Sequence, residues 1–250
     1  MSASDPNLAV KGIKNAQNKT NIPITSQQML GREDTHVKPI VGTQHRLQKD
    51  SLDAFLHMQQ QASISGVDIQ ICSSFRSFDK QLSIWNRKWS GELPLNTLDG
   101  GQINASDLND NEKIHAIMLW SALPGASRHH WGTDFDVYDK TQVENTGHDF
   151  QLVPEEYTDR GPCAKLNAWI QTHANEFDFY LPYADYTGGV AREPWHLSYS
   201  PIAAKIEQGF NMELLYASIE KADILGKASV LSVLPELVNR YTFNRGTKAP

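Results

Sequence analysis

The spacing of apolar and polar residues predicts separated helices and short strands in the first part of the chain. Apolar residues recur at roughly helical intervals between residues 44 and 62, which predicts a helix that ends before Gly66. Residues 67–72 are predicted to form a short buried strand, and residues 78–89 a helix with one apolar face. The segment 73–77 therefore lies at a junction between a strand and a helix.

The middle of the chain begins with a polar stretch, residues 90–107, that contains several glycines. Such a stretch predicts a surface excursion, and loops of this length often border a site. A helix is predicted over residues 111–120. Residues 133–138 alternate between polar and apolar, which predicts a strand with Asp134 and Asp136 on the same face.

The last part of the chain predicts a helix over residues 163–174 and aromatic-rich strand material over residues 177–186. A short strand is expected at residues 195–199, and two or three short helices after residue 201. Helices and strands do not alternate regularly along the chain. The predicted fold class is therefore α+β, with a small antiparallel sheet flanked by helices.

The domain organisation follows from the same patterns. Residues 1–40 are polar, contain three prolines and have no sustained period, which predicts an extended arm lying on the domain. Residues 41–200 are expected to form one catalytic domain, with the small sheet carrying its site. Residues 201–250 are expected to form a helical segment packed on that domain, because 250 residues allow one large core.

Composition and charge narrow the class of protein. Apolar residues make up 40% of the chain and charged residues 21%, as in ordinary globular proteins. The formal net charge is −6, and no long block of Lys or Arg exists, which argues against a nucleic-acid partner. No membrane span or signal peptide is visible, so we expect a cytoplasmic protein, or a periplasmic or cell-envelope one if an export signal was removed.

Two clusters of residues indicate metal-binding chemistry. The first is residues 127–136, Ser-Arg-His-His-Trp-Gly-Thr-Asp-Phe-Asp, and the second is residues 193–196, Glu-Pro-Trp-His. A catalytic zinc site needs three protein ligands, commonly imidazoles with at most one carboxylate, and one open position. Two histidines and one aspartate from these clusters meet that requirement.

His129, Asp136 and His196 are the predicted zinc ligands. His129 precedes a strand, and Gly132 permits a turn, so His129 can converge with Asp136 of the sheet on one ion. Glu193 comes three residues before His196. It is the predicted catalytic base, because an activated water needs a nearby carboxylate to take its proton.

These clusters resemble a known family. The first resembles the SxHxxGxxxD signature of the LAS metallopeptidases, the group that contains lysostaphin, D-alanyl-D-alanine carboxypeptidases and the zinc domain of sonic hedgehog. The second resembles their ExWH signature, and residues 73–77 followed by Gln81 resemble the YRS segment of the VanY-type branch. The resemblance covers residues 72–199, roughly half of the chain, and is closest to the VanY-type D-alanyl-D-alanine carboxypeptidases.

The resemblance implies a zinc carboxypeptidase that removes a terminal D-alanine from peptidoglycan-type peptides. It assigns zinc binding to His129, Asp136 and His196, and the role of base to Glu193. The residues expected to contact the substrate are Arg76, Ser127 and Gln81. Arg76 is also expected to assist catalysis by neutralising carboxylate or oxyanion charge, since a guanidinium binds a carboxylate through two hydrogen bonds.

Several alternatives stay open at this level. The residues alone do not separate His129 from His130 as the ligand, and Arg76 can instead be a structural ion-pair partner. Asp134 stands where the family usually has a small residue, and it is either an acceptor for a ligand histidine or a charge that restricts substrates. The rival functions are an L,D-carboxypeptidase, an endopeptidase that cuts stem peptides, and a non-catalytic binding module stabilised by zinc.

Overall fold

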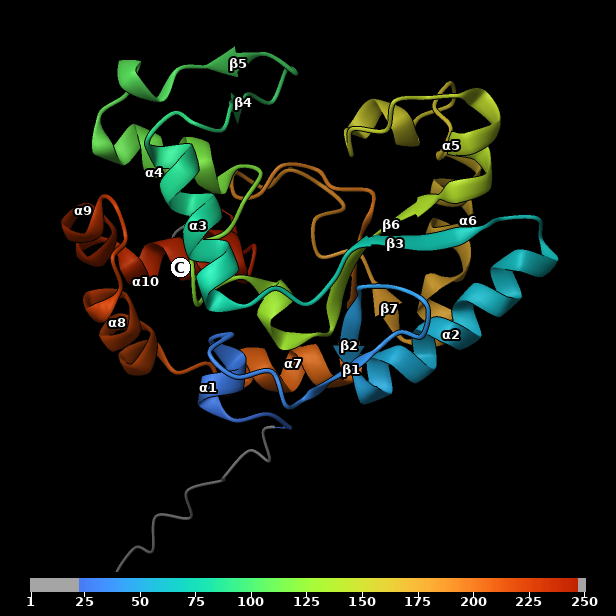
Figure 1. Ribbon diagram of the computed structural model, residues 1–250, viewed down its shortest axis with the longest axis horizontal. Helices are drawn as coiled ribbons and strands as arrows, with labels where there is room; N and C mark the ends of the chain where they lie inside the picture. The colour runs from blue at the N-terminus through green and yellow to red at the C-terminus, as the bar shows by residue number, and fades with distance from the viewer. Residues whose placement is uncertain (1–22, 247–250) are drawn as a thin grey trace, which may run out of the picture.

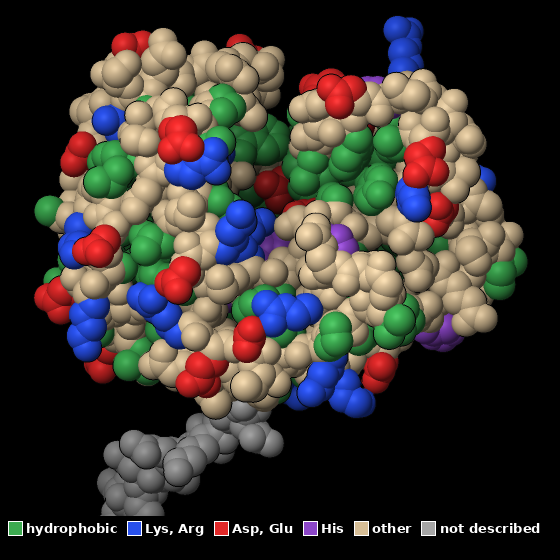
Figure 2. Space-filling model, in the orientation of Figure 1, with side chains coloured by type: hydrophobic (Ala, Val, Ile, Leu, Met, Phe, Trp, Pro, Cys, Tyr) green, Lys and Arg blue, Asp and Glu red, His purple; other side chains and the backbone are tan. Residues whose placement is uncertain are grey.

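The computed structural model describes residues 23–246, so most of the predicted arm, residues 1–22, lies outside the described residues. The chain forms two lobes (Figure 1), and a central cleft lies between them (Figure 2). One lobe is built mainly of helices and the other around a sheet. Residues 26–29 and 37–39 of the predicted arm form a short helix and a strand, so this part is not extended throughout.

The helices and strands follow one another in a mixed order along the chain. The helices are α1 (Ser26–Met29), α2 (Lys49–Ile64), α3 (Phe78–Trp89), α4 (Asp110–Met118), α5 (Lys140–Thr146), α6 (Ala164–His173), α7 (Ser200–Gln208), α8 (Met212–Lys221), α9 (Lys227–Ser232) and α10 (Leu234–Leu237). The strands are β1 (Val37–Pro39), β2 (Arg46–Gln48), β3 (Ile69–Ser73), β4 (Leu95–Asn96), β5 (Gln102–Ile103), β6 (Asp134–Asp139), β7 (Phe179–Tyr180) and β8 (His196–Tyr199).

A four-stranded sheet in the order β3-β6-β8-β7 lies at the centre of the sheet lobe. Its strand pairs are antiparallel, which confirms the predicted α+β class with a small antiparallel sheet flanked by helices. The register pairs Asp136 of β6 with Ser73 of β3 on one side and with His196 of β8 on the other. Residues from three separate parts of the sequence therefore form one row across the sheet.

Each lobe has its own large cluster of buried apolar residues. In the sheet lobe, Phe135 and Val137 of β6 pack with residues of α2 and α6, which is the buried face that the alternation in the sequence predicts. In the helical lobe, Trp85 of α3 packs with residues of α4, α8, α9 and α10. The helices after residue 201 therefore share a core with the middle of the chain.

Some predicted elements have different bounds in the structure. The helix expected over residues 44–62 begins only at Lys49, because Leu47 pairs with Lys38 in the β1–β2 hairpin and the Gln48 side chain caps α2. The strand material expected over residues 177–186 shortens to β7. After residue 201 the chain forms α7, α8, α9 and α10, one more helix than the largest number expected.

The polar excursion after α3 forms a small hairpin, in which β4 and β5 pair in an antiparallel manner. This hairpin stands at the top of the helical lobe, across the cleft from α5 (Figure 1). Within residues 23–246, the structure contains no helix with the length and apolar character needed to cross a bilayer.

Candidate active site

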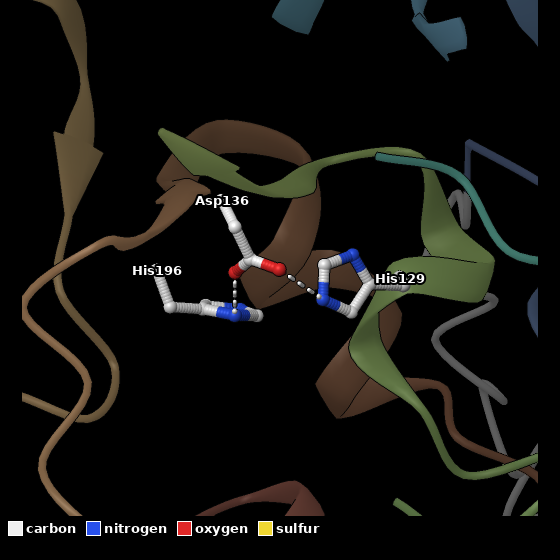
Figure 3. Close-up of side chains that lie close together, drawn as sticks. All are labelled: His129, Asp136 and His196. Atoms are coloured by element: carbon white, nitrogen blue, oxygen red, sulfur yellow. Dashed lines mark ion pairs between the residues drawn. The ribbon is translucent and has the colours of Figure 1, made fainter. Parts of the chain in front are cut away.

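Three side chains from the two sequence clusters converge on one point (Figure 3). His129 Nε2 lies 3.4 Å from Asp136 Oδ2, and His196 Nδ1 lies 3.0 Å from Asp136 Oδ1. One candidate ligand atom of each residue lies within 4.8 Å of the other two, and all three residues are buried. Strand register brings two of the three residues together, because Asp136 and His196 are direct cross-strand partners.

His129 reaches the cluster from a 3₁₀ turn, Arg128–Trp131, that precedes β6. Gly132 ends this turn with φ of 70°, in the left-handed region that favours glycine. A Cβ atom at this position would lie 2.5 Å from Val37 Cγ1 and 2.9 Å from the backbone nitrogen of Gln48. The turn therefore requires glycine both for its backbone conformation and for its close packing against β1 and β2.

The outer nitrogen of each histidine faces a hydrogen-bond acceptor. His129 Nδ1 lies 3.0 Å from the carbonyl oxygen of Ser74, and His196 Nε2 lies 3.1 Å from Asp134 Oδ1. A carbonyl and an ionised carboxylate can only accept, so each outer nitrogen carries the ring proton. The inner nitrogens, His129 Nε2 and His196 Nδ1, are therefore the ones left to supply a lone pair to a metal ion.

This donor set fits a zinc ion. Asp136 Oδ1 is buried and has no hydrogen-bond partner among the described residues, although His196 Nδ1 is 3.0 Å away. A metal cation among the three donor atoms would attract all of them and would give the buried carboxylate oxygen a partner. Ligand atoms about 2.0–2.2 Å from a tetrahedral Zn²⁺ are roughly 3.3–3.5 Å apart, close to the spacing found here.

His130, the neighbour of His129, is turned away from the cluster. Its Nδ1 lies 2.5 Å from the carbonyl oxygen of Arg76, and its Nε2 accepts the backbone N–H of Gly125 at 3.0 Å. Burial lowers the pKa of His130 to about 3, so the ring stays neutral with both nitrogens occupied. Of the two adjacent histidines, the structure brings only His129 to Asp136.

Asp134 lies beneath His196 and is fully buried. Its Oδ1 also accepts Arg128 Nε at 2.6 Å, while its Oδ2 accepts the hydroxyls of Thr133 at 2.6 Å and Ser198 at 3.1 Å. Burial alone would raise the pKa of Asp134, but Arg128 and then His196 lower it to about 2. Of the two roles considered for Asp134, the geometry matches the acceptor, because its charge is compensated and does not line the cavity.

A cavity of about 620 Å³ opens beside the cluster, between the two lobes. Figure 2 shows this hollow with acidic side chains at its bottom and hydrophobic side chains on the wall of the sheet lobe. Trp120 and Trp195 line it as a stacked pair, with ring centroids 6.2 Å apart. The β4–β5 hairpin and residues 151–155 form its rim. A cavity of this size accommodates a peptide of several residues.

Glu193 lines the bottom of the cavity next to the cluster. Its Oε2 lies 3.5 Å from His196 Nδ1, and its side chain is 12% exposed. Burial raises the pKa of Glu193 to about 8, which is the direction expected for a carboxyl group that exchanges protons near neutral pH. The backbone N–H of Glu193 donates to the carbonyl oxygen of Tyr183 at 2.9 Å and fixes the segment before β8.

Arg76 also lines the cavity, at the junction between β3 and α3. Its Nη1 donates to Gln81 Oε1 at 2.7 Å, and its Nη2 donates to Ser73 Oγ at 3.2 Å. No carboxylate of residues 23–246 forms an ion pair with Arg76, so the structural ion-pair alternative has no partner in this range. The remaining N–H groups of its guanidinium are available to a ligand.

Gln81 occupies a different place from the one predicted. Its side chain is fully buried and does not line the cavity. Its Nε2 donates to the carbonyl oxygen of Ala122 at 2.7 Å and to Ser121 Oγ at 3.1 Å, while its Oε1 accepts from Arg76. The geometry is therefore at odds with a direct contact between Gln81 and a substrate. Gln81 lies behind Arg76 and orients it.

Ser127 lies in the wall of the cavity and is 1% exposed. Its hydroxyl has no hydrogen-bond partner among the described residues. A buried hydroxyl without a partner costs free energy, which a polar group of a bound ligand would recover. This placement is compatible with the substrate contact predicted for Ser127.

Sequence reasoning missed three residues of the site. Arg128 and Ser198 both donate hydrogen bonds to Asp134, the acceptor behind His196. Lys88, on α3, lines the cavity on the same wall as Arg76. A signal for Lys88 existed in the sequence, because it follows Gln81 by seven residues and therefore shares its helical face.

Several solved structures are similar to this chain. VanYB in complex with D-Alanine-D-Alanine is 21% identical, with 74% of this chain and 89% of that chain covered and a TM-score of 0.48. A mutant of the vancomycin resistance D,D-pentapeptidase VanY in complex with Zn(II) is 22% identical, with 72% and 89% covered and a TM-score of 0.47. The LdcB LD-carboxypeptidase is 23% identical, with 71% and 74% covered and a TM-score of 0.48.

Comparison with curated proteins and with family models gives stronger matches. An uncharacterized protein of Haemophilus influenzae (strain ATCC 51907 / DSM 11121 / KW20 / Rd) is 36% identical over 121 residues, which are 48% of this chain and 92% of that protein. A second uncharacterized protein of the same strain is 35% identical over 103 residues, 40% of this chain and 70% of that protein. The model of the family VanY, D-alanyl-D-alanine carboxypeptidase, matches residues 44–202, more than half of the chain. The chain therefore belongs to the VanY family, a family of LAS-type zinc peptidases.

Proposed function

We propose that this protein is a zinc-dependent carboxypeptidase that removes the terminal D-alanine from peptidoglycan-type peptides. The observation that supports the proposal most directly is the convergence of His129, Asp136 and His196 at the bottom of a peptide-sized cavity, next to Glu193. Membership of the VanY family supports the choice of D-alanyl-D-alanine as the substrate.

His129 Nε2, Asp136 and His196 Nδ1 would hold the zinc ion. When bound, zinc supplies Lewis-acid polarisation of the scissile carbonyl. Ser74 and Asp134 keep the two imidazoles in the tautomer that ligation requires, because they accept the protons of the outer nitrogens.

Glu193 and Arg76 would carry out the remaining steps. Glu193 takes a proton from the attacking water and later passes it to the leaving amine, so that no covalent intermediate with the protein is needed. Arg76 faces the same space and neutralises negative charge on the substrate carboxylate or on the developing oxyanion. Gln81 and Ser73 hold the guanidinium in place for this role.

Mass spectrometry of stem peptides incubated with the zinc-loaded protein tests the proposal. The panel contains a pentapeptide that ends in D-Ala-D-Ala, a tetrapeptide that ends in one D-alanine after an L-centre, and a cross-linked dimer. We expect free D-alanine and tetrapeptide from the pentapeptide, and far slower release of both with Glu193→Gln.

Each rival function gives a different product. Release of D-alanine only from the tetrapeptide would identify an L,D-carboxypeptidase. Internal peptide fragments would identify an endopeptidase. Zinc-dependent binding of the peptides without turnover would identify a binding module.

A further inference from the structure

Lys88 adds a second cation to the cavity wall that carries Arg76. Lys88 follows Gln81 by seven residues on α3, which places the two on one helical face about 10 Å apart along the axis. Gln81 lies behind Arg76, and the Lys88 side chain lines the same cavity as Arg76, Glu193 and His196. The wall formed by α3 and the β3–α3 junction therefore presents two positive charges to one space.

The ammonium group of Lys88 forms no ion pair within the described part of the chain. Lys88 is half-buried, yet its Nζ forms no ion pair and no hydrogen bond with any residue between 23 and 246. By contrast, Arg128, the third cation that lines the cavity, is paired with Asp134 and Glu207. Burial, followed by repulsion from Arg76, lowers the pKa of Lys88, while Glu193 acts in the opposite direction.

A partly buried ammonium without a partner is unfavourable, and repulsion between Lys88 and Arg76 adds to this cost. An anion bound between the two would remove both penalties. The wall is therefore arranged for a ligand with a negative charge, which a guanidinium and an ammonium bind together more firmly than either does alone.

The position of Glu193 indicates which anion fits. Glu193 is the group that passes a proton to the leaving amine, and it lines the same cavity as Lys88 and Arg76. In an amino acid, the α-carboxylate is separated from the amine by a single carbon. A single residue that leaves with its amine at Glu193 therefore carries its carboxylate beside the two cations, whereas a longer leaving peptide has a neutral amide there.

We propose that Lys88 and Arg76 form a two-cation site for the free C-terminal carboxylate of the residue that is released. Lys88 is then a specificity-determining residue, because it selects substrates that lose one terminal amino acid over substrates cut internally. This inference rests on the proposed peptidase function, and it adds a residue, Lys88, that the function alone does not specify.

The experiment compares two peptides that differ only at the terminus, an acid and its amide, each ending in D-Ala-D-Ala. Zinc-loaded wild type, Lys88→Met and Lys80→Met are assayed for kcat/KM on both. Met is unbranched and similar in length to Lys, so it removes the charge with little change in shape. Lys80→Met is the matched control, because Lys80 lies on the same helix but is exposed and outside the cavity.

We expect Lys88→Met to lower kcat/KM for the acid by about 10-fold to 100-fold and to leave the slow turnover of the amide unchanged. Lys88→Arg is expected to recover part of the loss, and Lys80→Met to change neither rate. An equal loss on both peptides, or no loss on either, would overturn the proposal.

A binding measurement separates this inference from the proposed function. Calorimetric titration of Glu193→Gln and of Glu193→Gln with Lys88→Met, both zinc-loaded, gives the affinity for the acid and the amide without turnover. A weaker affinity for the acid alone in the double variant supports the carboxylate site, even if the wild type fails to release D-alanine. If the affinity lost in the double variant depends on the side-chain carboxylates of the stem peptide and not on its C-terminal carboxylate, the proposed carboxylate site is refuted.

Discussion

The floor and the rim of the cavity are built in different ways. The floor, defined as His129, Asp136 and His196, is fixed by strand register and by buried acceptors behind each imidazole. The rim, defined as the β4–β5 hairpin and residues 151–155, consists of two-residue strands and a loop in which Leu152 has φ of 59°. The floor is therefore positioned by the sheet and by the 3₁₀ turn before β6, whereas the rim is built from short strands and a loop.

The α3 wall is intermediate between these two regions. It is a regular helix, but Lys88, which it presents to the cavity, has no polar partner among the described residues. Floor variants should therefore change metal binding, whereas wall variants should change substrate turnover and leave the metal in place. The following predictions test this division, beginning with the largest expected effect.

Removal of a floor ligand should abolish metal binding. His129→Ala is expected to purify with almost no zinc and without activity, because only two of three ligands remain. His130→Ala is expected to keep most of its zinc and to lose about 1–3 kcal/mol of stability, since the Gly125 N–H loses its acceptor. Elemental analysis and thermal unfolding measure the two effects. Zinc loss in His130→Ala alone would reverse the assignment of the ligand.

Glu193→Gln should separate catalysis from metal binding. The substitution is nearly isosteric and leaves all three floor ligands, so we expect an unchanged zinc content. Turnover of the D-Ala-D-Ala peptide should fall by about 10²-fold to 10⁴-fold, because an amide cannot accept the proton. Loss of zinc would make Glu193 a ligand, and full turnover would direct the search for a base elsewhere.

Arg76→Ala should lower substrate turnover without changing metal binding. We expect kcat/KM for a peptide with a free carboxylate to fall by about 10-fold to 150-fold, the loss of a charge-assisted contact of roughly 1.5–3 kcal/mol. Zinc content and melting temperature should change little. Arg87→Ala serves as the control, because Arg87 is exposed on α3 and pairs only with Glu92. An unfolded variant with normal activity per folded molecule would show that Arg76 is structural.

Asp134→Asn should weaken zinc binding, because Asp134 is the acceptor behind His196. A neutral amide oxygen is a weaker acceptor for the N–H of His196 than a carboxylate is. We therefore expect zinc affinity to fall by about 10-fold to 100-fold. Ser198→Ala removes one hydrogen bond to Asp134 without touching His196, and it should change zinc affinity less. Competition with a chromophoric chelator measures both variants. Equal zinc affinity in Asp134→Asn and wild type would restrict Asp134 to a charge partner of Arg128.

The amino-acid sequence predicts the floor better than the rest of the site. Alternation over residues 133–138 places Asp134 and Asp136 on a strand, because the two-residue period of a strand depends only on local sequence. The match between Asp136 and His196 requires the register of β6 and β8, which depends on contacts far apart in sequence. The motif resemblance supplied that information where periodicity could not.

The residues around Arg76 and the residues that hold Asp134 were harder to predict from the sequence. Gln81 was expected at the substrate, but only the packing of α3 against residues 121 and 122 shows that it is buried behind Arg76. The Arg128–Asp134 pair was missed, because an ion pair between a 3₁₀ turn and the strand that follows it gives no periodic signal. The β2 strand was predicted as helix, since Leu47 fits a helical period as well as it fits the β1–β2 hairpin.

The pairing of Arg128 with Glu207 has a consequence for the boundaries of the folding unit. Glu207 belongs to α7, beyond residue 202, where the similarity to the family model ends. A fragment excised at that boundary would leave the buried Arg128 without one of its two carboxylates, and it would strip the helical lobe of α8, α9 and α10. Sequence similarity therefore marks the part of the chain shared by the family, whereas a stable catalytic module has to extend through α10.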